Sequence, residues 1–217
     1  MKNLIYKEFK LATPLLTYLF LAFSLMSFLP GYPILCGAFF VCFGIFQSYQ
    51  NGREDNDILY TVLLPVKKSD VVKAKYTAAI ILQMIAFGLF AAFTLIRMTF
   101  LPDAAAYVSN VLMNANFVFL AFVLLVFTAF NLVFVGGFFK TAYGFGKPFI
   151  AFIVVSFVII GIAETLHHLP GLGWLNVRDF GFIGRQLVIL LMSAALYVIV
   201  SMFSCKASQK RFEKIDL

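Results

Sequence analysis

Charged residues are scarce in this sequence of 217 residues. Asp, Glu, Lys and Arg make up 12% of it, against about 25% in an average soluble domain, while 62% of its residues are hydrophobic and 28 are Phe. A soluble core of this size has no room to bury so much apolar surface, which excludes an ordinary soluble protein. The sequence therefore predicts an integral membrane protein with a single domain, for which the bilayer acts as solvent.

The sequence also lacks the motifs of ATP-hydrolysing enzymes and of zinc proteases. The nearest match to a phosphate-binding loop, "YGFGKPF" (residues 143–149), has the wrong spacing and places Pro148 where a hydroxyl residue would hold magnesium. H-E-x-x-H is absent, and "ETLHH" (residues 164–168) has too few partners for a metal centre in a chain with two histidines. We therefore expect no enzymatic activity, no metal and no cofactor in this chain.

Neither the cysteines nor the net charge indicates a specialised function. Cys36 and Cys42 are held apart by one rigid segment and Cys205 lies far along the chain, so we expect three free thiols. The net charge of +7 comes without a basic cluster interleaved with aromatic residues, so nucleic-acid binding is not expected. The basic residues fit membrane loops better.

Six apolar segments approach or exceed the ~20 residues that a helix needs to cross a bilayer. They cover residues 13–29, 33–49, 76–101, 113–135, 148–163 and 182–203, of which the second and fifth are the shortest. All of the 17 lysines and arginines except Arg97, Arg178 and Arg185 fall on one side of these spans, and such an excess marks the cytoplasmic side.

This pattern predicts an all-α polytopic membrane protein with six transmembrane helices and both termini in the cytoplasm. Residues 1–217 form one transmembrane domain. Within it, residues 1–12 are expected as an amphipathic interfacial helix, 50–75 as a cytoplasmic coupling loop and 204–217 as a cytoplasmic tail.

The stretch "REDNDILYTVLLPVKKSD" (residues 53–70) is the most charged in the chain, and it contains a short amphipathic pattern. The expected apolar face holds Ile58, Leu59, Val62 and Leu63, opposite Asp57, Tyr60 and Thr61. Glu54, Asp55 and Asp57 would occupy the first turn, where the helix dipole favours acids, and Pro65 would end the helix. Because the polar face is acidic, we expect the apolar face to contact a cytoplasmic protein; contact with lipid and a plain turn between spans are the alternatives.

The adjoining stretch "LLPVKKSDVVKAKY" (residues 63–76) resembles the cytoplasmic loop of type 2 ABC transporter permeases. The residues on that pattern are Leu64, Pro65, Val66, Lys67, Lys68, Asp70, Val72, Lys75 and Tyr76. The six-span layout with an interfacial first helix extends the resemblance over the whole chain. Within the family, the small permeases that export amphipathic peptides, such as phenol-soluble modulins, are the most similar in size and composition.

The resemblance implies that the residues before Pro65 form a coupling helix seated on a separate ATPase subunit. The residues expected at that contact are Glu54, Asp55, Asp57, Ile58, Leu59, Val62 and Leu63. It further implies a dimer of permeases, identical or different, in a prokaryotic plasma membrane, with ATP and magnesium bound on the ATPase subunits and a substrate path between the permeases.

Few ionisable or strongly polar side chains lie within the predicted spans. Arg97 is expected as an anchor at the outer interface, with an Arg97–Glu164 gate pair as the sharper alternative. Asn131 is expected to join helices by hydrogen bonds or to line a pathway. The lack of a buried charge relay argues against a proton-coupled carrier and leaves an apolar path, which suits an amphipathic cargo.

The sequence therefore predicts the transmembrane subunit of an ATP-driven exporter of an amphipathic or hydrophobic substrate, with peptides among the candidates. One alternative is a membrane immunity or scaffold protein that binds a toxic peptide without transport. The other, less favoured, is an intramembrane hydrolase using Glu164, His167 and His168.

Overall fold

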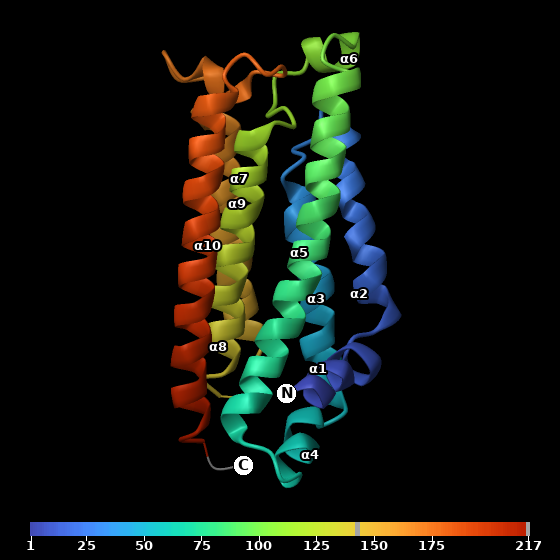
Figure 1. Ribbon diagram of the computed structural model, residues 1–217, viewed down its shortest axis with the longest axis vertical. Helices are drawn as coiled ribbons and strands as arrows, with labels where there is room; N and C mark the ends of the chain where they lie inside the picture. Colours follow the sequence, from blue (N-terminus) through green and yellow to red (C-terminus); the bar gives the residue numbers. More distant parts are fainter. Residues whose placement is uncertain (142–143, 216–217) are drawn as a thin grey trace.

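The long helices of the computed structural model run side by side in one elongated bundle (Figure 1). The structure describes residues 1–141 and 144–215. The long helices are α3 (Cys36–Glu54), α5 (Lys68–Phe100), α7 (Phe117–Ala129), α9 (Gly146–Leu166) and α10 (Ile183–Phe212). The short elements are α1 (Lys2–Lys7), the π-helical turn η1 (Glu8–Ala12), α2 (Leu15–Phe20), the 3₁₀ helix η2 (Leu21–Phe28), α4 (Asp57–Leu63), α6 (Ala105–Val108), the π-helical η3 (Phe130–Val135), α8 (Gly136–Phe138) and the 3₁₀ turn η4 (Gly173–Asn176). The described residues contain no strand, which confirms the all-helical prediction.

Within the described residues, four helices are long and apolar enough to cross a membrane: Lys68–Phe100, Phe117–Phe138, Gly146–Leu166 and Ile183–Phe212. A fifth candidate is added if the bent pair of segments Lys2–Ala12 and Leu15–Phe28 is counted as one span. α3 is not among them, because its last two turns carry polar residues from Gln47 to Arg53. The structure thus shows a multi-pass membrane protein with four or five candidate spans, and the count of six stays a prediction.

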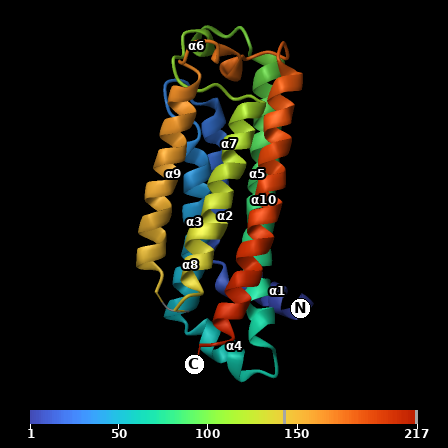
Figure 2. The same cartoon turned by 90° about the vertical axis from the view of Figure 1, so that its left-hand side faces the viewer.

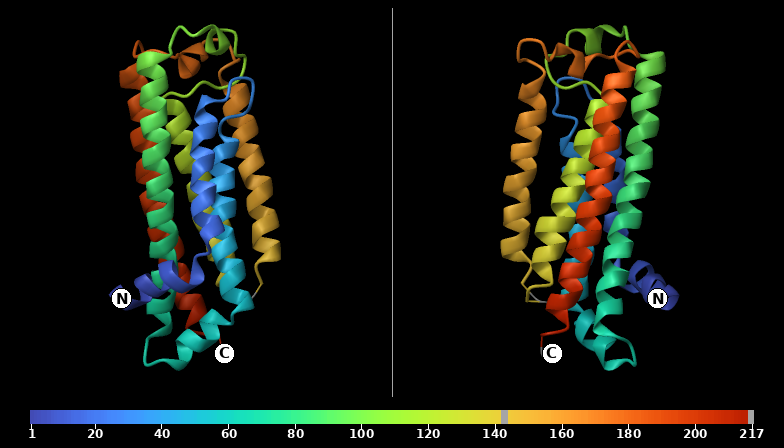
Figure 3. Two further views of the ribbon diagram at one scale, coloured as in Figure 1. Left: turned by 90° about the vertical axis from the view of Figure 1, so that its right-hand side faces the viewer. Right: turned by 60° about the vertical axis from the view of Figure 1, so that its left-hand side comes forward.

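A sharp bend separates the first helix from the bundle. The segments Lys2–Ala12 and Leu15–Phe28 meet at 89°. Thr13 and Pro14 are extended there, because proline disfavours helical geometry in the residue before it. Figure 3 shows the first helix lying across the lower part of the bundle, beside the lower part of α5.

α7 forms the centre of the bundle. Of the most apolar part of the span Phe117–Phe138, which α7 begins, 83% is buried inside the protein, against 22% for α9 and for α10. The reason is that α7 contacts α3, α5, α9 and α10 (Figure 2). The outer helices instead expose large apolar side chains, such as Val154 on α9 and Leu191 and Phe203 on α10. This distribution is the one expected when lipid surrounds the bundle.

Two glycines let the α2–η2 segment pack closely on α3. A Cβ at Gly44 would overlap the Cβ of Phe20, and one at Gly37 would lie 2.6 Å from the Phe23 carbonyl oxygen. The close approach lets Thr17 Oγ1 donate a hydrogen bond to the Gly44 carbonyl at 2.7 Å. Small residues at such helix crossings are typical of membrane proteins.

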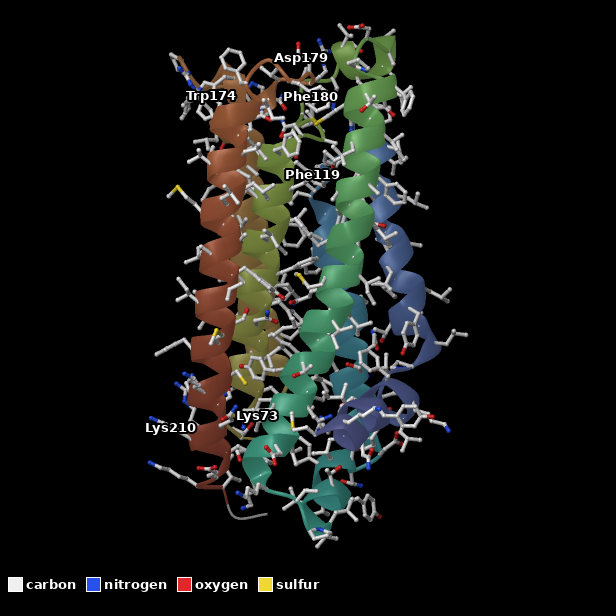
Figure 4. All side chains as sticks on the ribbon, viewed as in Figure 1. Lys73, Phe119, Trp174, Asp179, Phe180 and Lys210 are labelled. Carbon is white, nitrogen blue, oxygen red and sulfur yellow. The ribbon has the colours of Figure 1, made fainter. Side chains whose placement is uncertain are left out.

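The two ends of the bundle differ in chemistry. Figure 4 labels Lys73 and Lys210 towards the lower end and Trp174, Asp179 and Phe180 at the upper end. α1, α4 and the last turn of α10 also lie towards the lower end (Figure 1), which we call the basic end. The upper end, with α6 and η4, is the opposite end.

Candidate functional site

The helix expected in the charged loop is present as α4, but it begins later than predicted. α3 continues through Glu54, whose Oε1 accepts a hydrogen bond from Gln50 Nε2 at 3.2 Å, and Asp55 follows as its C-cap. Asn56 then turns the chain with a φ of 52°, a conformation that asparagine tolerates, and α4 runs from Asp57 to Leu63. Glu54 and Asp55 therefore end α3, and of the three acids only Asp57 lies in the first turn of α4.

The two sides of α4 also differ from the predicted wheel. Ile58 and Thr61 are buried against the rest of the chain, with 5% and 3% exposure, and Val62 is partly buried against the core. The exposed apolar side chains are Leu59 (36%), Tyr60 (64%), Leu63 (75%) and Leu64 (54%). We call these four residues the outer face of α4. The predicted apolar face is thus divided: the chain's own helices cover Ile58 and part of Val62, whereas Leu59 and Leu63 are exposed.

Beneath α4, four charged side chains of alternating sign form one cluster. Lys75 Nζ on α5 donates hydrogen bonds to Glu8 Oε2 at 3.0 Å and to Asp57 Oδ2 at 2.9 Å. Lys7 Nζ lies 2.9 Å from Glu8 Oε1 and donates to Asp57 Oδ1 at 2.7 Å and to Thr61 Oγ1 at 2.9 Å. Each carboxylate thus bridges both lysines. The cluster ties the N-terminal helix, α4 and the foot of α5 together.

The charge cluster is well shielded from solvent. The side chains of Lys75, Glu8, Asp57 and Lys7 are 4%, 6%, 13% and 17% exposed. Lys75 Nζ also lies 5.8 Å from the centre of the Tyr49 ring, and a Cβ at Gly52 would lie 3.5 Å from it, so α3 closes over the lysine. A buried charge that loses its partner destabilises a protein by about 3–5 kcal/mol. The cluster should therefore behave as one rigid joint.

The ionisation of Asp57 depends on this joint. Burial raises the pKa of its carboxyl, but Lys75 and Lys7 lower it by more, through their charges and hydrogen bonds, so the pKa lies below its ordinary value. A carboxyl whose pKa is lowered on folding stabilises the fold above its ordinary pKa, and this contribution disappears as the pH falls through the lowered value. Asp57 should therefore carry its negative charge at neutral pH.

A cleft of about 600 Å³ opens beside the joint. Its walls come from the N-terminal helix (Lys7, Leu11, Ala12), the end of α3 (Gly52, Asp55) and α4 with the residue after it (Asp57, Tyr60, Thr61, Leu63, Leu64). The cleft and the outer face of α4 together form an apolar surface at the basic end of the bundle, with Lys7, Asp55 and Asp57 as its charged residues.

The motif residue after Lys75 leads into a second buried network. Tyr76 OH lies 2.8 Å from Ser204 Oγ and 3.0 Å from Ser208 Oγ, both on α10, and donates to the Asn131 carbonyl at 3.3 Å. Asn131 Nδ2 in η3 donates to Gln83 Oε1 and to Ser201 Oγ, each at 3.0 Å. Gln83 Nε2 returns a bond to Asn131 Oδ1 at 3.1 Å, and Tyr197 OH donates to Gln83 Oε1 at 2.7 Å.

This network joins α5, η3 and α10 across the middle of the bundle. Asn131 is 0% exposed, and both ends of its side-chain amide are bonded. In this conformation Asn131 joins helices and lines none of the described clefts.

Arg97 does not lie at the lipid interface as expected. It is 3% exposed and donates to the Ser27 carbonyl at 2.6 Å and to Asn114 Oδ1 at 2.9 Å, with its guanidinium 3.9 Å from the centre of the Tyr107 ring. Glu164 Oε2 accepts a bond from the Met113 amide at 2.8 Å instead. Among the described residues no ion pair joins Arg97 to Glu164, so the gate pair is absent in this conformation.

The "ETLHH" segment has structural contacts of its own. His167 Nε2 is hydrogen-bonded to the Val111 carbonyl at 3.2 Å, and the rings of His167 and His168 lie 4.1 Å apart. Within residues 1–141 and 144–215, no three His, Cys, Asp or Glu side chains are grouped to hold a metal ion.

These features define a helical multi-pass membrane protein whose basic end carries a braced, outward-facing amphipathic helix. The family model for ABC-2 family transporter proteins matches residues 3–212, and the chain belongs to this family as a permease, that is, as a membrane component. Membership confirms the resemblance to type 2 ABC transporter permeases. The membrane component of this family generally has no enzymatic activity of its own and works with an ABC ATPase subunit. No curated protein and no solved structure matches the chain.

Sequence reasoning missed half of the charge cluster. Glu8 interrupts the apolar arc of the first helix and looks like a flaw in the pattern, yet it is 5% exposed and bonded to Lys75. In the sequence, Lys7 fits the polar face of the first helix and the general excess of positive charge, and neither role points to Asp57. The sequence holds one signal for the charge cluster. It is Glu8, an acid on the apolar side of an interfacial helix in a chain with few acids.

Proposed function

We propose that this chain is the transmembrane subunit of an ATP-driven ABC exporter, with six spans and its basic end in the cytoplasm of a prokaryotic cell. It works as a dimer with a second permease, identical or different, above two ATPase subunits that bind ATP and magnesium. Its substrate is amphipathic or hydrophobic, with peptides among the candidates, and leaves from the cytoplasm or the inner leaflet.

The observation that carries this proposal is the division of α4 into two sides. The outer face presents Leu59, Tyr60, Leu63 and Leu64 to the surroundings, while Asp57 and Thr61 on the other side are bound to the joint. Tyr60, Leu63 and Leu64 also line the cleft of about 600 Å³, so the exposed apolar side chains are contiguous, and a contiguous apolar patch marks an interaction site. α4 itself carries one charged residue, Asp57, and no base, so its outer face fits a protein groove better than an anionic lipid surface.

The route of the mechanical signal follows from the same contacts. When the ATPase subunits close, they push on the outer face, and the cluster around Lys75 passes the displacement to α5. α5 is one unbroken helix of 33 residues, so movement of its foot tilts the whole span. Tyr76 and Gln83 then carry the movement to η3 and α10.

The cleft between α5 and α10 supports an amphipathic cargo. It measures about 560 Å³ and has apolar walls that include Ile80, Val198 and Met202, with Lys73 and Lys206 also lining it. An apolar cleft with basic groups suits a chain that carries both apolar and acidic side chains.

Co-purification with and without an altered outer face tests the proposal. The parent chain, Leu59→Asp and Leu169→Asp are each isolated from native membranes in mild detergent, and the soluble proteins that accompany them are identified. A P-loop ATPase should accompany the parent chain and Leu169→Asp, whose change lies at an exposed leucine in the loop after α9. It should be lost with Leu59→Asp, while membrane insertion is unchanged. If no ATPase accompanies even the parent chain, the immunity or scaffold function becomes the better account.

A further inference from the structure

A second cleft at the basic end lies apart from α4 and is lined by residues of η3, α8, α9 and α10. Figure 2 shows α8 between the lower ends of α9 and α10. It measures about 830 Å³. Apolar and small residues form its walls: Leu132, Val133, Gly136, Gly137, Pro148 and Ala151. Lys140, Lys147 and Arg211 also line it, each from a different segment of the chain.

The electrostatics of this cleft favour an anion. No Asp or Glu of the described segments lines it, and none forms an ion pair with Lys140, Lys147 or Arg211 there. The first turn of α9, a helix of 21 residues, also begins at the cleft, and it carries no acid and no side-chain cap. The positive end of the helix dipole therefore adds to three cations that have no acidic partner among residues 1–141 and 144–215.

The walls of the cleft favour a ligand that also has an apolar part. Leu132 is 46% exposed on the outside of the π-helical turn η3 and connects the cleft with the lipid-facing surface. Gly137 allows α8 to lie against Pro148, since a Cβ there would approach the proline Cβ to 2.8 Å. Apolar walls together with three cations match the two parts of an anionic phospholipid, its acyl chains and its headgroup.

From these contacts we infer that the cleft binds an anionic phospholipid, with the headgroup phosphate at Lys140, Lys147 and Arg211 and an acyl chain along Leu132 and Val133. Basic pockets between transmembrane helices on the cytoplasmic side bind such headgroups in other proteins. The inference rests on the proposed function only for the placement of the basic end at the inner leaflet. It needs neither the ATPase nor a transported substrate, so it can fail while the exporter proposal stands.

The test compares three probes on the full-length purified chain: phosphatidylglycerol, phosphatidylcholine with the same acyl chains, and inorganic phosphate. The readout is the probe concentration that produces half of the maximal rise in the thermal unfolding temperature of the chain. The cleft variant carries Lys140→Gln, Lys147→Gln and Arg211→Gln. A control variant removes the same charge outside the cleft, with Lys2→Gln, Lys210→Gln and Lys214→Gln.

Phosphatidylglycerol should stabilise the parent chain and the control variant at low concentration. The cleft variant should bind it on the order of a hundredfold more weakly, at about fivefold per basic residue. Equal effects of both lipids, or equal weakening in both variants, would show that general charge and not the cleft attracts the lipid. Inorganic phosphate acting as strongly as phosphatidylglycerol would make this a site for free anions and overturn the lipid assignment.

Acetylation of lysines in the unmodified chain keeps the inference testable if the cleft variant fails to fold. Bound phosphatidylglycerol should protect Lys140 and Lys147 several-fold more than phosphatidylcholine does. Lys210 and Lys214, which line none of the described clefts, should react equally with either lipid. Equal protection of all four lysines would contradict the inference.

Discussion

Replacing Lys75 by Met should uncouple the transporter and lower its stability by about 3–5 kcal/mol, because it leaves Glu8 and Asp57 buried with one lysine between them. The measurement is the free energy of unfolding of the detergent-solubilised chain, together with the ATPase activity of the complex in the presence of substrate. Stability should fall, and stimulation of the ATPase by substrate should disappear, since α4 and α5 are no longer held together.

Two further variants separate this effect from a general loss of charge. Lys73→Met removes a lysine two residues away whose side chain is 46% exposed and pairs with Asp70 at 3.6 Å, so it should cost about 0–1 kcal/mol. The double variant Lys75→Met with Glu8→Gln restores neutrality around Lys7 and Asp57 and should recover part of the loss. Lys73→Met serves as the control for stability alone, because Lys73 also lines the cleft between α5 and α10. If Lys75→Met costs no more stability than Lys73→Met, the cluster is not the joint described above.

Replacing Asn131 by Leu should produce the second large effect, a loss of stability without a change in substrate range. The substitution leaves the Gln83 amide nitrogen and Ser201 hydroxyl without their partner, and each orphaned buried group costs about 1–3 kcal/mol. Unfolding of the solubilised chain measures this cost, and transport per folded molecule measures the function.

Thr128→Val is the matched control for this prediction. Thr128 lies one turn before Asn131 and is also buried, but its hydroxyl donates only within its own helix, to the Leu124 carbonyl at 2.7 Å. Its loss should cost less than about 1 kcal/mol. If Asn131→Leu instead keeps full stability and changes which substrates are exported, Asn131 lines the substrate pathway and does not serve to join α5, η3 and α10.

The general architecture could be predicted because hydropathy constrains it so strongly. A long apolar segment such as the one in α5 has few alternatives to a membrane helix, and the excess of basic residues at one end follows from the same physics. The span count is less secure where a helix continues beyond its apolar part, as α3 does after Gln47, or where it bends, as the chain does at Pro14.

The details of the site depend on which contacts the chain makes with itself. A helical wheel identifies Ile58 and Leu59 as equally apolar, but it cannot say that the bundle covers Ile58 and leaves Leu59 outside. Arg97 looks like an interfacial residue at the end of a span until a carbonyl and an amide from distant segments are found around it. Such pairings are long-range and leave no periodic trace in the sequence.

Photo-crosslinking from position 63 is the most direct test of the claim that the outer face of α4 is the contact with the ATPase. A benzoylphenylalanine replaces Leu63, which is 75% exposed, in cells that contain the whole complex, and the same group at Ile58, 5% exposed, serves as the inward-facing control. Position 63 should crosslink to a P-loop ATPase subunit, and position 58 should crosslink only within the chain. Crosslinks from position 63 to lipid alone, or to a protein without a P-loop, would contradict the account.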